Sequence, residues 1–428
     1  MESCLENSNE SFEPKVQPQP DGPNKPPRTP GTRVGAGDGE PPPWSDIESI
    51  RRRPAVFVGS TKESGLHHLI LDLIMRIVSS TDDSCHVEVC VNGNSSVSIT
   101  VDKTHWLNSE TSFELTESSL NSSFTKLPLP WNESESAARR IVSRDLPVPF
   151  AVVNALSEYL YIEVVHDGCE YRKKFARGIS WDLLSSSASK KTDSFSITLL
   201  PDDEIFEISD EDGHTKPVEL SRQAFSSHLR QTAFLYRSRR LSLKDLRPLA
   251  EVESEVFQYE GGIAQYVEYL NEERTTLHAL PIYFSATVDH VFLECALQWT
   301  NLYSQSVYSF VNGISTMEGG THLAGFSSAV RRALTDYGRE TKTIGENEMM
   351  LYFDDFAEGL TAIINVLMDK PELTGQTLEY LSNSEVQNIA EKIVADRLLA
   401  WLKEHPQEAE QIVRKGLDTA DYNRKYRR

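Results

Sequence analysis

The chain has 428 residues, which is more than one ordinary domain holds and suits two or three domains. Hydrophobic residues make up 39% of it, enough for packed cores, so we expect a mostly globular protein. The formal net charge of −21 opposes the non-specific attraction to phosphate that nucleic-acid-binding proteins usually exploit, so any DNA contact must come from local basic patches.

The five cysteines form no CxxC pair and no even framework, which indicates reduced thiols in a reducing compartment. Cys85, His86 and Cys90 lie close together in the sequence, but no second ligand pair follows them. Alternating residues of a strand explain these three better than a metal site, and we expect no bound metal there.

Residues 1–44 are rich in Pro, Gly, Ser and Asn, which predicts a disordered leader. The leader carries acidic residues and lacks the Arg-rich, amphipathic character of a transit peptide, and no stretch of the chain is apolar for long enough to cross a bilayer. We therefore expect a protein of the nucleus or cytosol with no transit peptide and no membrane contact.

Ordered structure is expected from residue 45 onward. Residues 46–50 suit a short capped helix, and apolar residues at helical spacing predict a second helix over 65–78. Valine and isoleucine then alternate with polar residues over 87–91 and 97–101, which predicts a hairpin with its turn at Gly93 and Asn94. Residues 107–137 are rich in Ser, Asn and Thr with little periodicity, so we expect a loop where a nucleotide-binding domain could carry a lid.

Strands and helices interleave through the rest of the chain. A glycine turn at Gly261 and Gly262 opens a helix, and Ser384 is a candidate N-cap for a helix that stops at Pro406, before a last polar helix. Further strands are expected over 159–165, 195–200, 282–286, 291–299, 307–312 and 360–368, and a helix over 322–337. This pattern predicts an α+β protein in two domains.

Several motifs in a fixed order resemble the gyrase B and topoisomerase IV B subunits, which are the B subunits of type IIA DNA topoisomerases. The resemblance is strongest in residues 259–277 (YEGGIAQYVEYLNEERTTL), 311–326 (VNGISTMEGGTHLAGF), 355–364 and 375–377, and weaker in 53–69, 152–157 and 201–206. Long co-linear motifs are more specific than one isolated glycine loop. The resemblance runs from about residue 46 to residue 428, covers the ATPase and transducer regions only, and is closest to a divergent plant gyrase-B-like paralogue.

The resemblance implies an α+β fold in which a GHKL-type (Bergerat) ATPase α/β sandwich precedes a ribosomal-S5-domain-2-like transducer domain. After the leader over 1–44, it places a degenerate ATPase-like domain over 45–250, the transducer over 251–404 and a polar C-terminal helix over 405–428. No Toprim domain is expected, because no acidic metal-binding signature follows the transducer. Complete DNA strand passage by this chain alone is therefore not expected.

The resemblance also assigns positions in an ATP site, and two of them lie on the helix after Gly65. The family glutamate that polarises the attacking water falls on Asp72, and the family asparagine that binds Mg²⁺ falls on Arg76. Aspartate is one methylene shorter than glutamate, and base catalysis depends on reach. A guanidinium has no lone pair for Mg²⁺, so the resemblance implies no metal ligand at this place.

The remaining positions of the ATP site are also altered. The adenine-recognising aspartate falls on Asp102, but the Gly-x-Gly after it is replaced by Lys103 and His105. The glycine-rich phosphate lid is replaced by residues 144–149, which include Pro147 and Pro149, and proline offers no N–H for a phosphate.

Two further nucleotide-binding positions are carried over by the resemblance. Ser194 keeps the hydroxyl of a pocket threonine. Gln376 matches the switch loop that senses the γ-phosphate, although the lysine of that loop is replaced by Leu378. The phosphate-reading charge is therefore missing.

Two functions are compatible with this pattern. The first is a pseudo-ATPase that serves as an interaction or dimerisation module linked to DNA topology or chromatin, with no certain cofactor. The second is a divergent ATP-binding subunit of an ATP-hydrolysing type II DNA topoisomerase that acts with other chains and binds Mg·ATP. Both imply protein partners, contact with DNA or chromatin through a complex, and the option of a dimer.

Overall fold

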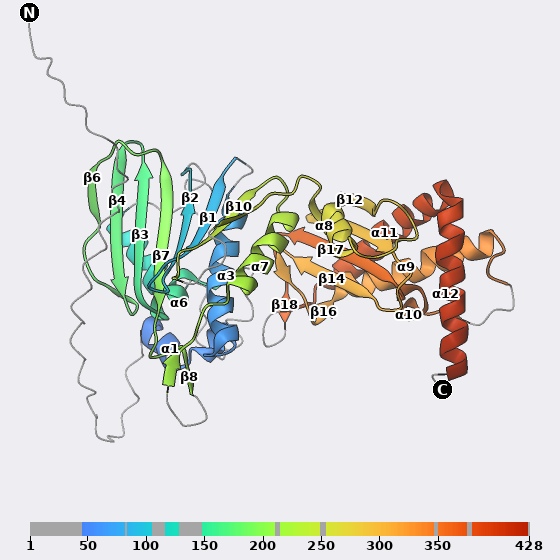
Figure 1. The fold of residues 1–428 in the computed structure, drawn as a ribbon, viewed down its shortest axis with the longest axis horizontal. Coiled ribbons are helices and arrows are strands. Elements are labelled where there is room, and N and C mark those ends of the chain that lie inside the picture. The colour runs from blue at the N-terminus through green and yellow to red at the C-terminus, as the bar shows by residue number, and fades with distance from the viewer. Residues whose placement is uncertain are drawn as a thin grey trace, which may run out of the picture. The chain divides into compact units, whose positions relative to one another are not determined.

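The protein folds around two large β-sheets, each with its own hydrophobic core (Figure 1). The first core is built from residues between 47 and 257, and the second from residues between 282 and 420. Helices and strands interleave throughout, which confirms the predicted α+β class. The computed structural model describes residues 45–81, 84–104, 116–127, 148–209, 215–248, 254–345, 350–374 and 379–426.

The first sheet has nine strands and is antiparallel except where the strand His86–Val91 (β1) pairs with the strand Arg240–Asp245 (β10). Its strands are β1 (His86–Val91), β2 (Val97–Val101), β3 (Ser157–His166), β4 (Cys169–Ala176), β5 (Ile179–Ser180), β6 (Ser185–Ala188), β7 (Ser194–Pro201), β10 (Arg240–Asp245) and β11 (Ser254–Phe257). They run in the order β11-β10-β1-β2-β7-β3-β4-β5, with β6 beside β4. The predicted hairpin is confirmed, because β1 and β2 pair in a register that places Val87 opposite Val101.

Helices cover one face of this sheet. They are α1 (Asp46–Arg52), α2 (Ala55–Val58), α3 (Glu63–Ser80), α4 (Glu117–Thr125), α6 (Phe150–Ala155) and α7 (Arg222–Leu235), and a small hairpin of β8 (Glu207–Ser209) and β9 (Thr215–Pro217) lies apart from the sheet. The apolar stripe of α3, which includes Leu69, Leu73 and Ile77, packs into the core with the valines of β1 and β2. Ser45 forms a capping box with Glu48 at the start of α1, as the predicted capped helix requires.

The prediction of a loop over 107–137 is wrong for its middle part, because α4 forms there. α4 buries only Leu120 and Phe124. Two apolar residues in nine are too few to show the helical spacing that would predict a helix from the sequence. Phe124 stacks on Phe175 of β4 and lies 4.9 Å from the ring of Phe150 in α6, centroid to centroid. Tertiary packing therefore stabilises a helix that local propensity does not.

The second sheet has five strands in the order β12-β13-β17-β14-β15. These are β12 (Ile282–Val288), β13 (Val291–Trp299), β14 (Ser306–Val311), β15 (Ile314–Ser315) and β17 (Leu360–Met368), while β16 (Gly319–Gly320), β18 (Leu373–Thr374) and β19 (Tyr380–Leu381) form a small separate sheet. The strands predicted over 291–299 and 360–368 are confirmed to the residue. Mostly apolar sequence over a strand length is typical of strands buried on both faces.

Both faces of this sheet are covered by helices. The helices are α8 (Gly262–Leu270), α9 (Thr321–Glu340), α10 (Phe353–Ala357), α11 (Ser384–Glu404) and α12 (Pro406–Tyr426). Residues of α9 and α11 share a core with Leu293 and Cys295 of β13, whereas α8 packs on Ala296, which points to the other face. The N-cap predicted at Ser384 is wrong by one residue, because Asn383 is the N-cap and makes no side-chain cap. Within the described ranges, no helix is long and apolar enough to span a bilayer.

Candidate functional site

One face of α3 carries the residues predicted to act on ATP. His68, Asp72 and Arg76 are four residues apart, so they lie one above another on the same side of the helix. The start of α3 is fixed by Gly65, where an added Cβ would lie 1.7 Å from the carbonyl oxygen of Ser60. Gly65 thus allows Ser60 to lie against the first turn of α3. This contact positions the face of the helix that carries His68, Asp72 and Arg76.

Asp72 is held by groups from two elements. Its Oδ2 accepts a hydrogen bond of 3.2 Å from the backbone N–H of Val148, just before α6, and lies 3.5 Å from Nε2 of His68. Burial raises the pKa of the Asp72 carboxyl, and His68, the Val148 N–H and Arg76 act against that rise. The Asp72 side chain is therefore held by His68 of the same helix and by the backbone just before α6.

Arg76 lies where the resemblance places a ligand of Mg²⁺. The centre of its guanidinium is 4.9 Å from the centre of the Phe150 ring in α6, a cation–π distance. Mg²⁺ prefers oxygen ligands in octahedral geometry, and a guanidinium offers five N–H donors and no acceptor. The side chain at this position does not fit the expected metal.

His228 on α7 is a residue of this site that the sequence did not indicate. Its Nε2 is buried and has no hydrogen-bond partner among the described residues. Burial, and to a smaller extent the nearby His68, lower the pKa of His228 to about 4, so its imidazole is neutral at pH 7. The helix α7 was not predicted from the sequence, so no pattern indicated that His228 would lie near α3.

Asp102 and Ser194 are brought to the same end of two adjacent strands. The register of β2 and β7 pairs Val101 with Phe195, so the residues after Val101 and before Phe195 are neighbours. Asp102 is exposed, and its Oδ1 accepts a 2.7 Å hydrogen bond from the backbone N–H of His86. This carboxylate therefore closes the end of the β1–β2 hairpin.

The side chains that enter the core at that strand end are apolar. Val101 is 0% exposed and Phe195 is 1% exposed. Neither side chain can accept from or donate to an adenine, and both lie on the face of the sheet that packs against the helices. Recognition of a base at this place would have to use other groups.

Several predicted positions lie outside the described residues: Gln376, Leu378, His105 and Pro147. Pro149 is described, and it is the N-cap of α6 with a φ of −61°. It supplies no N–H at the point where the chain enters the helix beside Asp72.

A second polar cluster lies at the ends of β2, β3 and β7. His166 Nδ1 is 3.3 Å from Asp193 Oδ2, His166 Nε2 is 3.6 Å from Asp167 Oδ2, and the Thr104 hydroxyl donates to Asp193 Oδ2 over 2.9 Å. The two carboxylates thus lie at opposite nitrogens of one ring. His166, Asp167 and Asp193 each offer one possible ligand atom within 4.8 Å of the others, but Thr104 and the His166 ring already contact Asp193 Oδ2, and we assign no ion to this cluster.

Three residues in or next to β1 were considered for metal binding: Cys85, His86 and Cys90. Cys85 is buried, whereas the Cys90 thiol donates to Asn92 Oδ1 over 3.5 Å. Nε2 of His86 is 2.9 Å from the hydroxyl of Ser242 on β10. Each side chain is thus engaged with its own neighbours in the sheet.

The chain is similar to known proteins over most of its length. The family model described as DNA gyrase B matches residues 262–428. The DNA gyrase B subunits of Streptococcus pyogenes serotype M3 and Halalkalibacterium halodurans are 32% and 33% identical to this chain over 374 residues. These alignments cover 87% of this chain and 56% and 57% of the two relatives, so the chain spans just over half their length.

Solved structures are similar over nearly their entire length. The 43K ATPase domain of Thermus thermophilus gyrase B, solved in complex with an aminocoumarin, matches with a TM-score of 0.68 and 26% identity, covering 90% of this chain and 97% of that chain. The gyrase B subunit of Myxococcus xanthus matches with a TM-score of 0.69 and 23% identity, covering 86% of this chain and 99% of that chain, and supports the fold alone.

Proposed function

This chain belongs to the DNA gyrase B family, and from that premise we propose that it is a pseudo-ATPase, a gyrase-B-like module that retains the fold but not ATP hydrolysis. Its role in this proposal is to bind other proteins within a complex that acts on DNA topology or chromatin. The observation that carries the proposal is Arg76, a metal-incompatible cation packed on Phe150 one turn from Asp72.

Two further features support the loss of hydrolysis. Asp72 Oδ2 is held by His68 and the Val148 N–H, and aspartate is one methylene shorter than the glutamate expected here, so its carboxylate reaches less far toward a water. Asp102 accepts from the backbone of His86, and its strand end presents Val101 and Phe195 to the core. Metal binding, water activation and base recognition are thus each altered, and function depends on such sites more than on the fold.

A rescue experiment tests this proposal. The double variant Asp72→Glu/Arg76→Asn restores the side chains expected for the family, yet we predict phosphate release from Mg·ATP no faster than in protein-free buffer. Restoring two residues does not reshape the strand end at Val101 and Phe195, and catalytic groups that act as a unit fail together. The natural chain and the double variant would be compared in a phosphate-release assay, with the ATPase domain of Thermus thermophilus gyrase B as positive control.

Two positive results would have different meanings: turnover by the natural chain would contradict the proposal, whereas turnover by the double variant alone would contradict only the expectation that the rest of the site is altered. Turnover by the natural chain would mean that Asp72 and Arg76 support hydrolysis as they stand. Turnover by the double variant alone would mean that the rest of the site is intact and that these two residues account for the loss.

The second candidate function is a divergent ATP-binding subunit of an ATP-hydrolysing type II topoisomerase. It is favoured by the close structural likeness to an ATPase domain and by a carboxylate still held on the inner face of α3 at Asp72. In this alternative other chains supply the missing metal ligand, and a purified partner would raise turnover of Mg·ATP.

A further inference from the structure

The outer edge of the second sheet is formed by β12. This strand pairs with β13 on one side, and no strand of the described chain pairs with its other side. A free edge presents backbone N–H and C=O groups that can accept another extended segment. The edge is therefore a template for strand addition.

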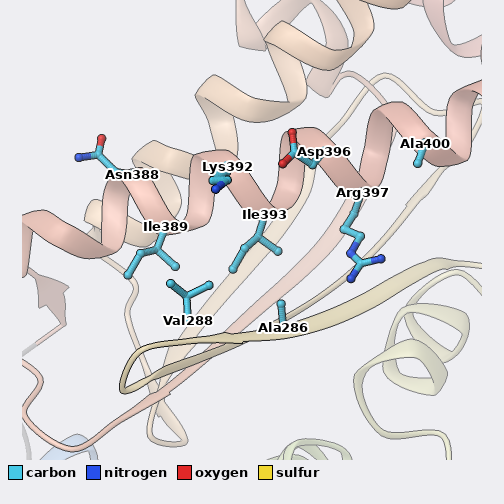
Figure 2. Close-up of a pocket in the computed structure, with 9 residues that line it drawn as sticks. All are labelled: Ala286, Val288, Asn388, Ile389, Lys392, Ile393, Asp396, Arg397 and Ala400. Atoms are coloured by element: carbon cyan, nitrogen blue, oxygen red, sulfur yellow. The ribbon is translucent and has the colours of Figure 1, made fainter.

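A groove of about 510 Å³ runs between this strand and α11, a size within the usual range of binding pockets. Figure 2 shows α11 lying over the β12–β13 hairpin, with Ile389, Ile393 and Arg397 directed toward Val288 and Ala286. The apolar part of the groove thus comes from both elements. Val288 remains 37% exposed, which leaves room for another side chain against it.

The groove also carries positive charge. Lys392 and Arg397 line it and are exposed, and in the described part of the chain neither has an ion-pair partner. Asp396 is the acidic residue of the lining. By contrast, Lys403 on the same helix pairs with Glu340 at 2.8 Å, so the two basic residues of α11 without such a pair among the described residues are the two that line the groove.

We propose that β12 and α11 bind an extended, acidic peptide segment of a partner protein. The segment adds to β12 as a further strand and places alternate apolar side chains between Val288 and Ile389. Its acidic residues, two positions further along the same face of the strand, then meet Lys392 and Arg397. Strand addition beside a helix is a known mode of peptide recognition, in which backbone hydrogen bonds give affinity and the pocket gives selectivity. This inference goes beyond the proposed function and does not depend on the nucleotide site.

Fluorescence anisotropy with defined peptides tests the inference in the absence of nucleotide. The probe is a labelled peptide of about ten residues in which threonine alternates with valine and glutamate in turn, so that valine and glutamate share one face of a single strand. Two comparison peptides replace every glutamate by lysine, or every second valine by proline, which removes N–H groups needed for pairing. We expect saturable binding of the first peptide and none of the other two.

Variants of the full chain locate the binding. Lys392→Glu/Arg397→Glu should weaken binding by at least about tenfold, because two attractive contacts become repulsive. Lys370→Glu reverses an exposed charge outside the groove and should leave affinity unchanged. Circular dichroism would verify that each variant keeps its fold.

Three outcomes would overturn the proposal. Equal affinity in the Lys392→Glu/Arg397→Glu variant would place binding elsewhere. Equal binding of the proline peptide would exclude strand addition. A dimer in sedimentation that this variant abolishes would identify a second copy of the chain as the occupant. None of these results bears on ATP hydrolysis, and turnover of ATP would leave this inference untouched.

Discussion

Replacing Gly65 by valine is expected to lower the midpoint of thermal unfolding by about 6–12 °C, which corresponds to a loss of about 3 kcal/mol. A Cβ at this position would lie 1.7 Å from the Ser60 carbonyl oxygen and 2.5 Å from its carbon. Both are backbone atoms that cannot rotate away, so either the loop at residue 60 or the first turn of α3 must move. That turn sets the position of His68, Asp72 and Arg76.

Scanning calorimetry measures this effect, and the chain offers a matched control. An added Cβ at Gly93 would lie 3.5 Å from the Leu246 carbonyl oxygen, which is an ordinary contact. We therefore expect Gly93→Ala to leave the midpoint nearly unchanged. If Gly65→Val melted with the natural chain, the close approach of residue 60 to α3 would not exist in solution.

Removing the carboxylate of Glu117 is expected to cost about 2–3 kcal/mol. Its Oε1 is 2.6 Å from Nζ of Lys173, whose side chain is 0% exposed. The Lys173 ammonium also donates to the hydroxyl of Ser180 and to the carbonyl of Asp182. Glu117→Ala leaves this buried charge without its anion, and the partial exposure of Glu117 keeps the cost below the upper range for buried pairs.

A double-mutant comparison separates the charge effect from simple packing. We expect Glu117→Ala/Lys173→Met to regain most of the lost stability, because it removes the buried ammonium together with its partner. Calorimetric midpoints of the two single variants and the double variant provide the measurement. A double variant less stable than Glu117→Ala would mean that Lys173 acts through packing and that its charge is well compensated without Glu117.

The Glu117–Lys173 pair also explains a feature that the sequence could not predict. It ties α4 to β4, and Phe124 of α4 then packs on Phe150, the residue beneath Arg76. The partners of Glu117 and Phe124 are more than 25 positions distant along the chain, at Lys173 and Phe150. A polar, serine-rich stretch reads as a loop when such distant partners are unknown.

The strands of the second sheet were predicted from the sequence more accurately than the side-chain arrangement of the candidate nucleotide site. Strands over 291–299 and 360–368 are long apolar runs with clear ends, so pattern alone defines them. The motif predicted that Asp102 lies at the end of β2, but it did not predict which way the side chain points. That direction follows from the pleat, which turns Val101 into the core and leaves Asp102 exposed beside His86.

Calorimetric titration of the full chain with Mg·ATP tests the proposed loss of the nucleotide site most directly. With Arg76 at the place of the metal ligand and Val101 and Phe195 at the strand end, we predict no saturable heat of binding below about 1 mM nucleotide. A submillimolar dissociation constant that Asp102→Ala abolishes would contradict the loss of nucleotide binding, would sink the strict form of the pseudo-ATPase proposal, and would favour the divergent ATP-binding subunit instead.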